Sequence, residues 1–137
     1  MKTSRIAALP ILVISALCLM AALPPKHQPL PVGDWGGDHI RMTVTDGGAD
    51  LDFDCASAKI PWPIQVDGGS FDVRGSYHAE HAGPVRRDEE SSTDNARFTG
   101  KLSGKQIELT VTLVDGNKTI GHFVLEKDRI ARVFKCR

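Results

Sequence analysis

The sequence lacks net charge, because 17 Lys and Arg side chains balance 17 Asp and Glu side chains. A protein that coats nucleic acid carries a clear basic excess, so the composition argues against a nucleic-acid partner. A hydrophobic fraction of 41% and a charged fraction of 25% argue against a wholly disordered chain. At 137 residues, the chain has room for one domain of ordinary size.

Catalytic motifs are also missing. The Ser-Ser-Thr run at residues 91–93 has no G-x-S-x-G frame around it, and no glycine-rich phosphate loop opens a helix. His78, Glu80 and His81 could ligate a metal or serve an enzyme, but on a strand His81 points away from the other two. We therefore predict a protein that is not an enzyme and that holds neither a metal nor a cofactor.

Charged residues are absent from residues 6–23, an apolar stretch that follows a short basic start. This layout is typical of a secretory signal, so we predict a signal peptide over residues 1–22. Two alternatives stay open: an uncleaved membrane anchor through residues 6–23, and a lipoprotein that carries lipid on Cys18. In all three cases the rest of the chain is extracytoplasmic, either periplasmic or secreted.

Residues 23–32 are rich in proline. A proline-rich stretch is extended and fairly stiff, so we expect a linker here and a single domain over residues 33–137. Lys2 and Arg5 belong to the predicted signal peptide, so after its cleavage the exported part has 15 positive side chains and 17 negative ones. Such a domain is not drawn strongly to an anionic membrane surface, and we expect membrane contact only if the N-terminal segment is retained.

Cysteine is scarce, with three residues in the chain. Cys18 lies in the predicted signal, so Cys55 and Cys136 remain in the exported part. Two cysteines in an exported domain most simply form one disulfide, and free thiols are the alternative. Without C-x-x-C spacing, the pair makes a poor zinc ligand set.

A helical period is missing beyond the N-terminal stretch, and the dominant period is two. Ile40, Met42 and Val44 alternate with polar residues, and so do the apolar residues of the stretch 107–113. Turn residues recur between such stretches. We predict an all-β fold, an antiparallel up-and-down meander of seven to eight strands that closes as a small barrel, with a β-sandwich as the alternative. The last strand is expected over residues 130–136.

Three acidic residues, Asp50, Asp52 and Asp54, resemble the start of a calcium loop. They alternate with the apolar residues Leu51 and Phe53. This alternation places the carboxylates on the outer face of a strand, so we expect a solvated face, with a cation site as the alternative.

Residues 79–95 form one long polar insertion, which is either functional or mobile. Within it, Arg86 and Arg87 face a run of acidic residues, and they form either a self-neutralised loop or a contact for an anionic partner. Trp62 lies between two prolines, where it either plugs one end of the barrel or offers an aromatic contact to a ligand. The candidate ligand-binding residues are Trp62, Tyr77, His81, Arg86 and Arg87.

The run Gly33–Trp35 opens the first predicted strand and resembles the G-x-W element of lipocalins and, more loosely, of avidins. In those barrels the tryptophan closes the base, and an arginine on the last strand often packs against it. The resemblance implies these structural roles for Trp35 and Arg132.

The pattern of residues 33–40, together with residues 53–55 and 135–136, looks like small secreted bacterial β-barrel proteins of unassigned function. That resemblance implies no activity. The function that we predict is an exported non-enzymatic barrel that binds a small ligand or a protein through loops at its open end. The alternative is a secreted inhibitor or an envelope interaction protein without a ligand pocket.

Overall fold

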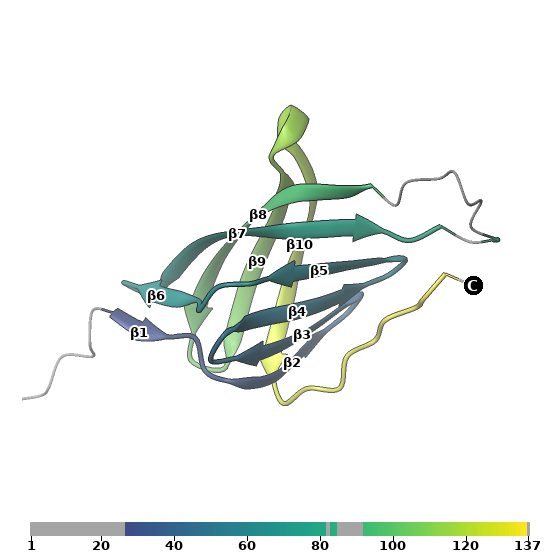
Figure 1. Ribbon diagram of the computed structural model, residues 1–137. Helices are drawn as coiled ribbons and strands as arrows, with labels where there is room; N and C mark the ends of the chain where they lie inside the picture. Colours follow the sequence, from purple (N-terminus) through teal and green to yellow (C-terminus); the bar gives the residue numbers. More distant parts are fainter. Residues whose placement is uncertain (1–26, 82, 85–91, 137) are drawn as a thin grey trace, which may run out of the picture.

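The computed structural model describes residues 27–81, 83–84 and 92–136 of the chain (Figure 1). The predicted signal peptide, with Cys18, lies outside the described residues, as do Arg86 and Arg87. Most of the described chain is β-strand. The strands are β1 (His27–Pro29), β2 (Gly33–Gly37), β3 (Ile40–Thr45), β4 (Gly48–Phe53), β5 (Ala56–Ile60), β6 (Gln65–Asp67), β7 (Ser70–Ala79), β8 (Thr93–Ser103), β9 (Gln106–Leu113) and β10 (Lys118–Lys127), and a single 3-10 turn, η1, covers Asp115–Asn117.

Eight of these strands form a closed antiparallel barrel. Their order around the barrel is β2-β3-β4-β5-β7-β8-β9-β10, and β10 pairs with β2. The pairing between β10 and β2 therefore closes the sheet on itself, and the longest ladder joins β7 to β8, from Ser70–Lys101 to His78–Thr93. The predicted meander and its closure as a barrel are therefore confirmed, and the sandwich alternative is wrong. The two remaining strands, β1 and β6, lie outside the barrel.

The antiparallel order gives the barrel two ends, which we call the base and the open end. The base carries the β3–β4 and β8–β9 turns and the segment between β5 and β7. The open end carries the β2–β3, β4–β5, β7–β8 and β9–β10 connections. In Figure 1 the base lies at the left and bottom, and the open end lies at the right and top.

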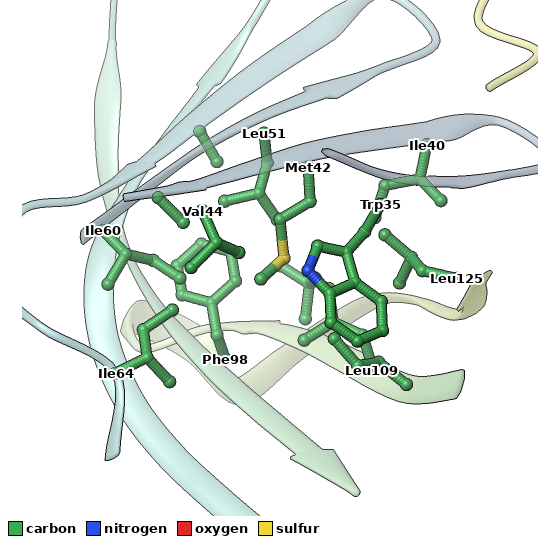
Figure 2. Packing of buried hydrophobic residues seen from close by; sticks show 14 of the residues in the cluster. Trp35, Ile40, Met42, Val44, Leu51, Ile60, Ile64, Phe98, Leu109 and Leu125 are labelled. Atoms are coloured by element: carbon green, nitrogen blue, oxygen red, sulfur yellow. The ribbon is translucent and has the colours of Figure 1, made fainter. Parts of the chain in front are cut away.

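Large apolar side chains fill the interior. Trp35 is only 1% exposed, and its Nε1 donates a hydrogen bond to the carbonyl oxygen of Pro31 at 3.1 Å. Figure 2 shows the indole among Met42, Leu109 and Leu125, all of which are buried. Phe98 is fully buried as well. The alternation of apolar residues predicted for β3 and β9 therefore does point into the core, as the period of two requires.

The C-terminal segment after β10 is not the strand that the sequence predicted over residues 130–136. It runs along the outside of the barrel and forms one isolated bridge, between Arg132 and Asp38. A side chain at Gly36 would meet main-chain atoms of Arg129 and Ala131, so the segment crosses directly over the outer face of β2. Its main-chain hydrogen bonds go to Gly37, His39 and Cys55, at the β2–β3 and β4–β5 turns, and not along a neighbouring strand. No continuous ladder forms, so the alternation of residues 130–136 did not produce a strand.

Part of the predicted linker belongs to the folded body. β1 pairs with β6 in the register His27–Asp67 to Pro29–Gln65. Leu30 is buried, and its N–H donates to the carbonyl oxygen of Ile64 at 2.9 Å. Proline fits here because β1 is an edge strand, where a missing N–H costs little.

The polar insertion predicted over residues 79–95 is shorter than expected. β7 continues to Ala79 and β8 begins at Thr93, because both strands gain a full ladder of backbone hydrogen bonds from each other. The connection at the open end therefore spans residues 80–92. Residues 82 and 85–91 of it lie outside the described part of the chain.

The predicted disulfide is confirmed by the positions of Cys55 and Cys136. Their sulfur atoms lie at bonding distance, and their Cα atoms are 4.8 Å apart. Cys55 lies in the β4–β5 turn at the open end. The bond therefore ties the end of the described chain to the barrel.

Truncating the two tryptophans should have very unequal effects on stability. Trp35→Ala empties a large buried volume, so we expect the free energy of unfolding to fall by about 3–5 kcal/mol. Trp62 is 61% exposed, and Trp62→Ala should change this free energy by no more than about 0.5 kcal/mol. Urea unfolding followed by circular dichroism measures both, and equal losses in the two variants would contradict the packing described above.

The disulfide predicts a second effect on stability. The bonded cysteines are separated by 81 positions, and in the chain-entropy model a loop of this length contributes about 4–5 kcal/mol. The double variant Cys55→Ser, Cys136→Ser should lose about this amount in urea unfolding, and the wild-type protein in reductant should behave like it. A double variant as stable as the oxidised protein would be inconsistent with this account.

Candidate functional site

Half-buried apolar side chains gather at the open end. Tyr77, Leu113, Ile120 and Phe123 pack against the core without being fully covered. They come from β7, β9 and β10, and two of them, Tyr77 and Phe123, lie against the buried ring of Phe53, the last residue of β4. We call these five residues the mouth. Apolar surface of this kind on a rigid strand scaffold is the usual chemistry of a recognition site.

Three aromatic rings form the centre of the mouth. The ring centroid of Phe53 lies 5.8 Å from that of Tyr77 and 5.1 Å from that of Phe123. Both pairs are tilted, with interplanar angles of 54°, as aromatic pairs prefer. The contacts hold the two outer rings in place, so the mouth is preorganised and an occupant would not have to order it.

A mismatch between β10 and β2 explains why the mouth is not covered. β10 pairs with β9 from Lys118 to Glu126, but with β2 only at Glu126 and Lys127. On this side of the barrel, the part of β10 before Glu126 therefore has no ladder with β2. The ladder also shifts between Thr119 and Gly121, leaving Ile120 as a bulge. Bulges re-aim side chains near functional sites, and this one lies directly at the mouth.

Tyr77 gives the mouth a hydrogen-bonding group. Burial raises the pKa of Tyr77 above its usual value of 10.0, and the carboxylate of Asp94 raises it further. The phenol therefore stays protonated at neutral pH. It offers one O–H donor at the edge of an otherwise apolar surface.

A polar cluster lies beside the mouth at the β4–β5 turn. We call its members, His39, Asp52, Asp54, Glu80 and Lys135, the rim cluster. His39 Nδ1 is 2.5 Å from Asp54 Oδ2, and the N–H of Phe134 donates to Asp54 Oδ1 at 2.7 Å. The hydrogen bond from Phe134 is the main reason that the pKa of Asp54 lies below its usual value of 3.8; burial opposes it, and His39 adds to the lowering. Asp54 thereby joins the β2–β3 turn to the C-terminal segment.

Lys135 completes the rim cluster. Its Nζ lies 3.1 Å from Asp52 Oδ1 and 3.1 Å from Glu80 Oε1, and it donates to the carbonyl oxygen of Ala56 at 3.0 Å. Burial lowers the pKa of Lys135, but the hydrogen bonds and charges of the two carboxylates outweigh burial and raise it. This ammonium thus fixes the C-terminal segment to β4, to β5 and to the residue that follows β7.

The predicted ligand-binding residues do not form one site. Tyr77 lies in the mouth, and His81 is exposed just past β7 at the same end. Arg86 and Arg87 are outside the described residues. Trp62 comes two residues after Ile60, the last residue of β5. Because β5 runs antiparallel to β7, Trp62 lies at the base, and it is too exposed to plug the barrel there.

The cation that lies over the Trp35 ring is Lys127, and not Arg132 as predicted. Lys127 Nζ lies 5.8 Å from the centroid of the Trp35 ring. Arg132 is exposed and uses its main chain instead, donating to Gly37 O and accepting from the N–H of His39. The reason is that residues 130–136 do not form the last strand, so Lys127, at the end of β10, takes the place beside the indole.

The three aspartates of β4 and its turn are engaged with basic side chains. Asp50 lies 3.8 Å from Lys59 Nζ. Within the rim cluster, Asp52 contacts Lys135 and Asp54 contacts His39. All three lie on the outer face, as the alternation predicted. Within the described part of the chain, no group of three or more His, Cys, Asp and Glu side chains is arranged to hold a metal ion.

A groove of about 460 Å³ lies outside the barrel, between the β2–β3 hairpin and the C-terminal segment. Among its lining residues, Asp34 accepts a hydrogen bond from Thr43 at 2.8 Å, and Arg129 lies 3.4 Å from Asp38. These charged groups already have protein partners. The groove is therefore a weaker candidate than the mouth.

Sequence reasoning missed Phe53, Leu113, Ile120 and Phe123 as members of a site. The alternation of β10 is broken between Thr119 and Gly121, and this break was the one available signal. The contact between His39 and Asp54 had no sequence signal, because it depends on where the β2–β3 and β4–β5 turns meet.

Neither family models nor curated proteins nor solved structures give a match to this chain. The described residues contain no helix that is long and apolar enough to cross a membrane. The function must therefore be argued from the mouth and the rim cluster. The resemblance to lipocalins at Gly33–Trp35 stays a prediction.

Asp54 predicts a pH-dependent attachment of the C-terminal segment. Because its pKa is lowered in the folded protein, its ionisation stabilises the fold fully above pH 3.8 and progressively less as the pH falls below that value. Asp54→Asn should therefore speed hydrogen exchange at Phe134 at neutral pH, and the difference from wild type should shrink below pH 3.8. Asp50→Asn is the matched control, since the partner of Asp50 is Lys59 of β5 and not the C-terminal segment. A variant that exchanges like wild type at neutral pH would contradict the role of Asp54.

Proposed function

We propose that this chain is an extracytoplasmic binding protein without enzymatic activity that recognises its partner at the open end of the barrel. The observation that carries the proposal is the mouth itself, where aromatic and aliphatic side chains are held in place but left half covered. A folded protein gains by covering such surface, so an apolar occupant is favoured there.

Two observations support an extracytoplasmic location. The Cys55–Cys136 bond is typical of proteins that fold in an oxidising compartment. The uncharged apolar stretch over residues 6–23 is typical of export. A periplasmic or secreted protein and a protein anchored through residues 6–23 both agree with these observations.

The chemistry of the mouth indicates what kind of group would fit. The rings of Phe53, Tyr77 and Phe123 favour an aromatic or branched aliphatic group, and the Tyr77 hydroxyl favours a hydrogen-bond acceptor beside it. The interior below is filled, so the occupant rests on the mouth rather than entering a deep lumen. A small ligand with one apolar group and an apolar side chain of a protein both satisfy these requirements.

The filled interior also favours a second function, that of a secreted inhibitor or an envelope interaction protein without a ligand pocket. Trp35, Met42 and Phe98 leave no room for a ligand between them. Recognition would then involve a broader surface that includes the rim cluster.

Site-specific photocrosslinking tests the proposal. A benzophenone side chain replaces Tyr77 in one variant and Lys101 in another, and both are irradiated in the intact envelope of the host. Lys101 is exposed on the outer face of β8 near the base, so it is the matched control. We expect an adduct at position 77, identified by mass spectrometry, and none at position 101. Adducts at both positions, or at position 101 alone, would contradict recognition at the mouth.

A further inference from the structure

The base carries an exposed apolar surface that the proposed function does not use. Trp62 is 61% exposed and Val32 is 53% exposed. Pro31 and Pro63 are exposed as well. The two segments run side by side, because the N–H of Leu30 donates to Ile64 O at 2.9 Å. We call Pro31, Val32, Trp62 and Pro63 the base patch.

The base patch is rigid. Pro61 and Pro63 restrict the backbone on both sides of Trp62. Ile60 and Ile64, just beyond them, are buried in the core at 1% and 3% exposure. The indole is therefore held out from the barrel by a fixed frame. An exposed tryptophan in such a frame loses little entropy when it binds, so it is suited to an interface.

The short stretch of chain between the apolar residues 6–23 and β1 indicates what covers this patch. The described chain begins there, in β1, which leads directly into Pro31 and Val32. The uncharged apolar stretch ends at Leu23. Four residues reach at most about 14 Å, so a bilayer that holds residues 6–23 lies within this distance of β1.

We propose that residues 6–23 stay in the membrane and that the base patch rests on the lipid surface beside them. Tryptophan is enriched at this interface because its ring is apolar and its N–H is polar. The base then faces the bilayer and the mouth faces away from it. This inference concerns the opposite end of the barrel from the proposed function, so either can fail without the other.

The two tryptophans make the proposal measurable. The full chain, with residues 1–22 retained, is reconstituted into phosphatidylcholine vesicles whose acyl chains carry bromine, a short-range quencher of indole emission. Trp35 is buried, so the variant Trp62→Phe reports the emission of Trp35 alone. We expect bromine to remove most of the Trp62 emission in the wild-type protein and to leave the Trp62→Phe variant unchanged.

A relocated tryptophan serves as the matched control. Phe134 is 68% exposed and lies at the open end beside the rim cluster. In the double variant Trp62→Phe, Phe134→Trp, the new indole should keep its emission in brominated vesicles and should remain open to iodide in the water.

Three outcomes would overturn the proposal. In the first, Trp62 keeps its emission in brominated vesicles and remains open to iodide. In the second, Trp62 is shielded from both quenchers, which would assign the patch to a protein contact or to a second copy of this chain. In the third, intact mass shows that the protein from its own host begins at residue 23.

Discussion

The pairing of β10 with β2 is the constraint on which the rest of the structure depends, because it joins the last strand of the meander to the first and turns an open sheet into a barrel. Two glycines let large side chains lie inside the closed wall. A side chain at Gly100 would collide with the ring of Phe71, and one at Gly75 would meet main-chain atoms of Lys59 and approach the ring of Phe98. Closure joins the edges of β2 and β10 where they meet and encloses a core that is filled rather than hollow.

The strand pattern was predictable because each strand buries one face. Residues 40–44 and 107–111 alternate between core and solvent, and this local signal does not depend on which strand lies next. The path of residues 130–136 was not predictable in this way. Its apolar residues Ile130 and Phe134 are exposed, and its position follows from long-range contacts with Gly36 and with Cys55.

The candidate site was predictable only in part. Tyr77 lies in the mouth, where the sequence analysis made it a ligand-binding candidate. Phe123 belongs there because β10 extends past the end of β2, and a strand-length mismatch cannot be recognised before the register is known. Trp62 was assigned to the same site on chemical grounds, but the antiparallel order of β5 and β7 puts it at the other end.

Chemical-shift mapping tests the central claim, that the open end is the recognition surface. Isotope-labelled protein is titrated with the soluble, lipid-free fraction of its host envelope, and backbone and methyl resonances are followed. Our account predicts shifts concentrated at Tyr77, Leu113, Ile120 and Phe123. Shifts confined to the outer faces of the strands, with these four residues unchanged, would contradict it.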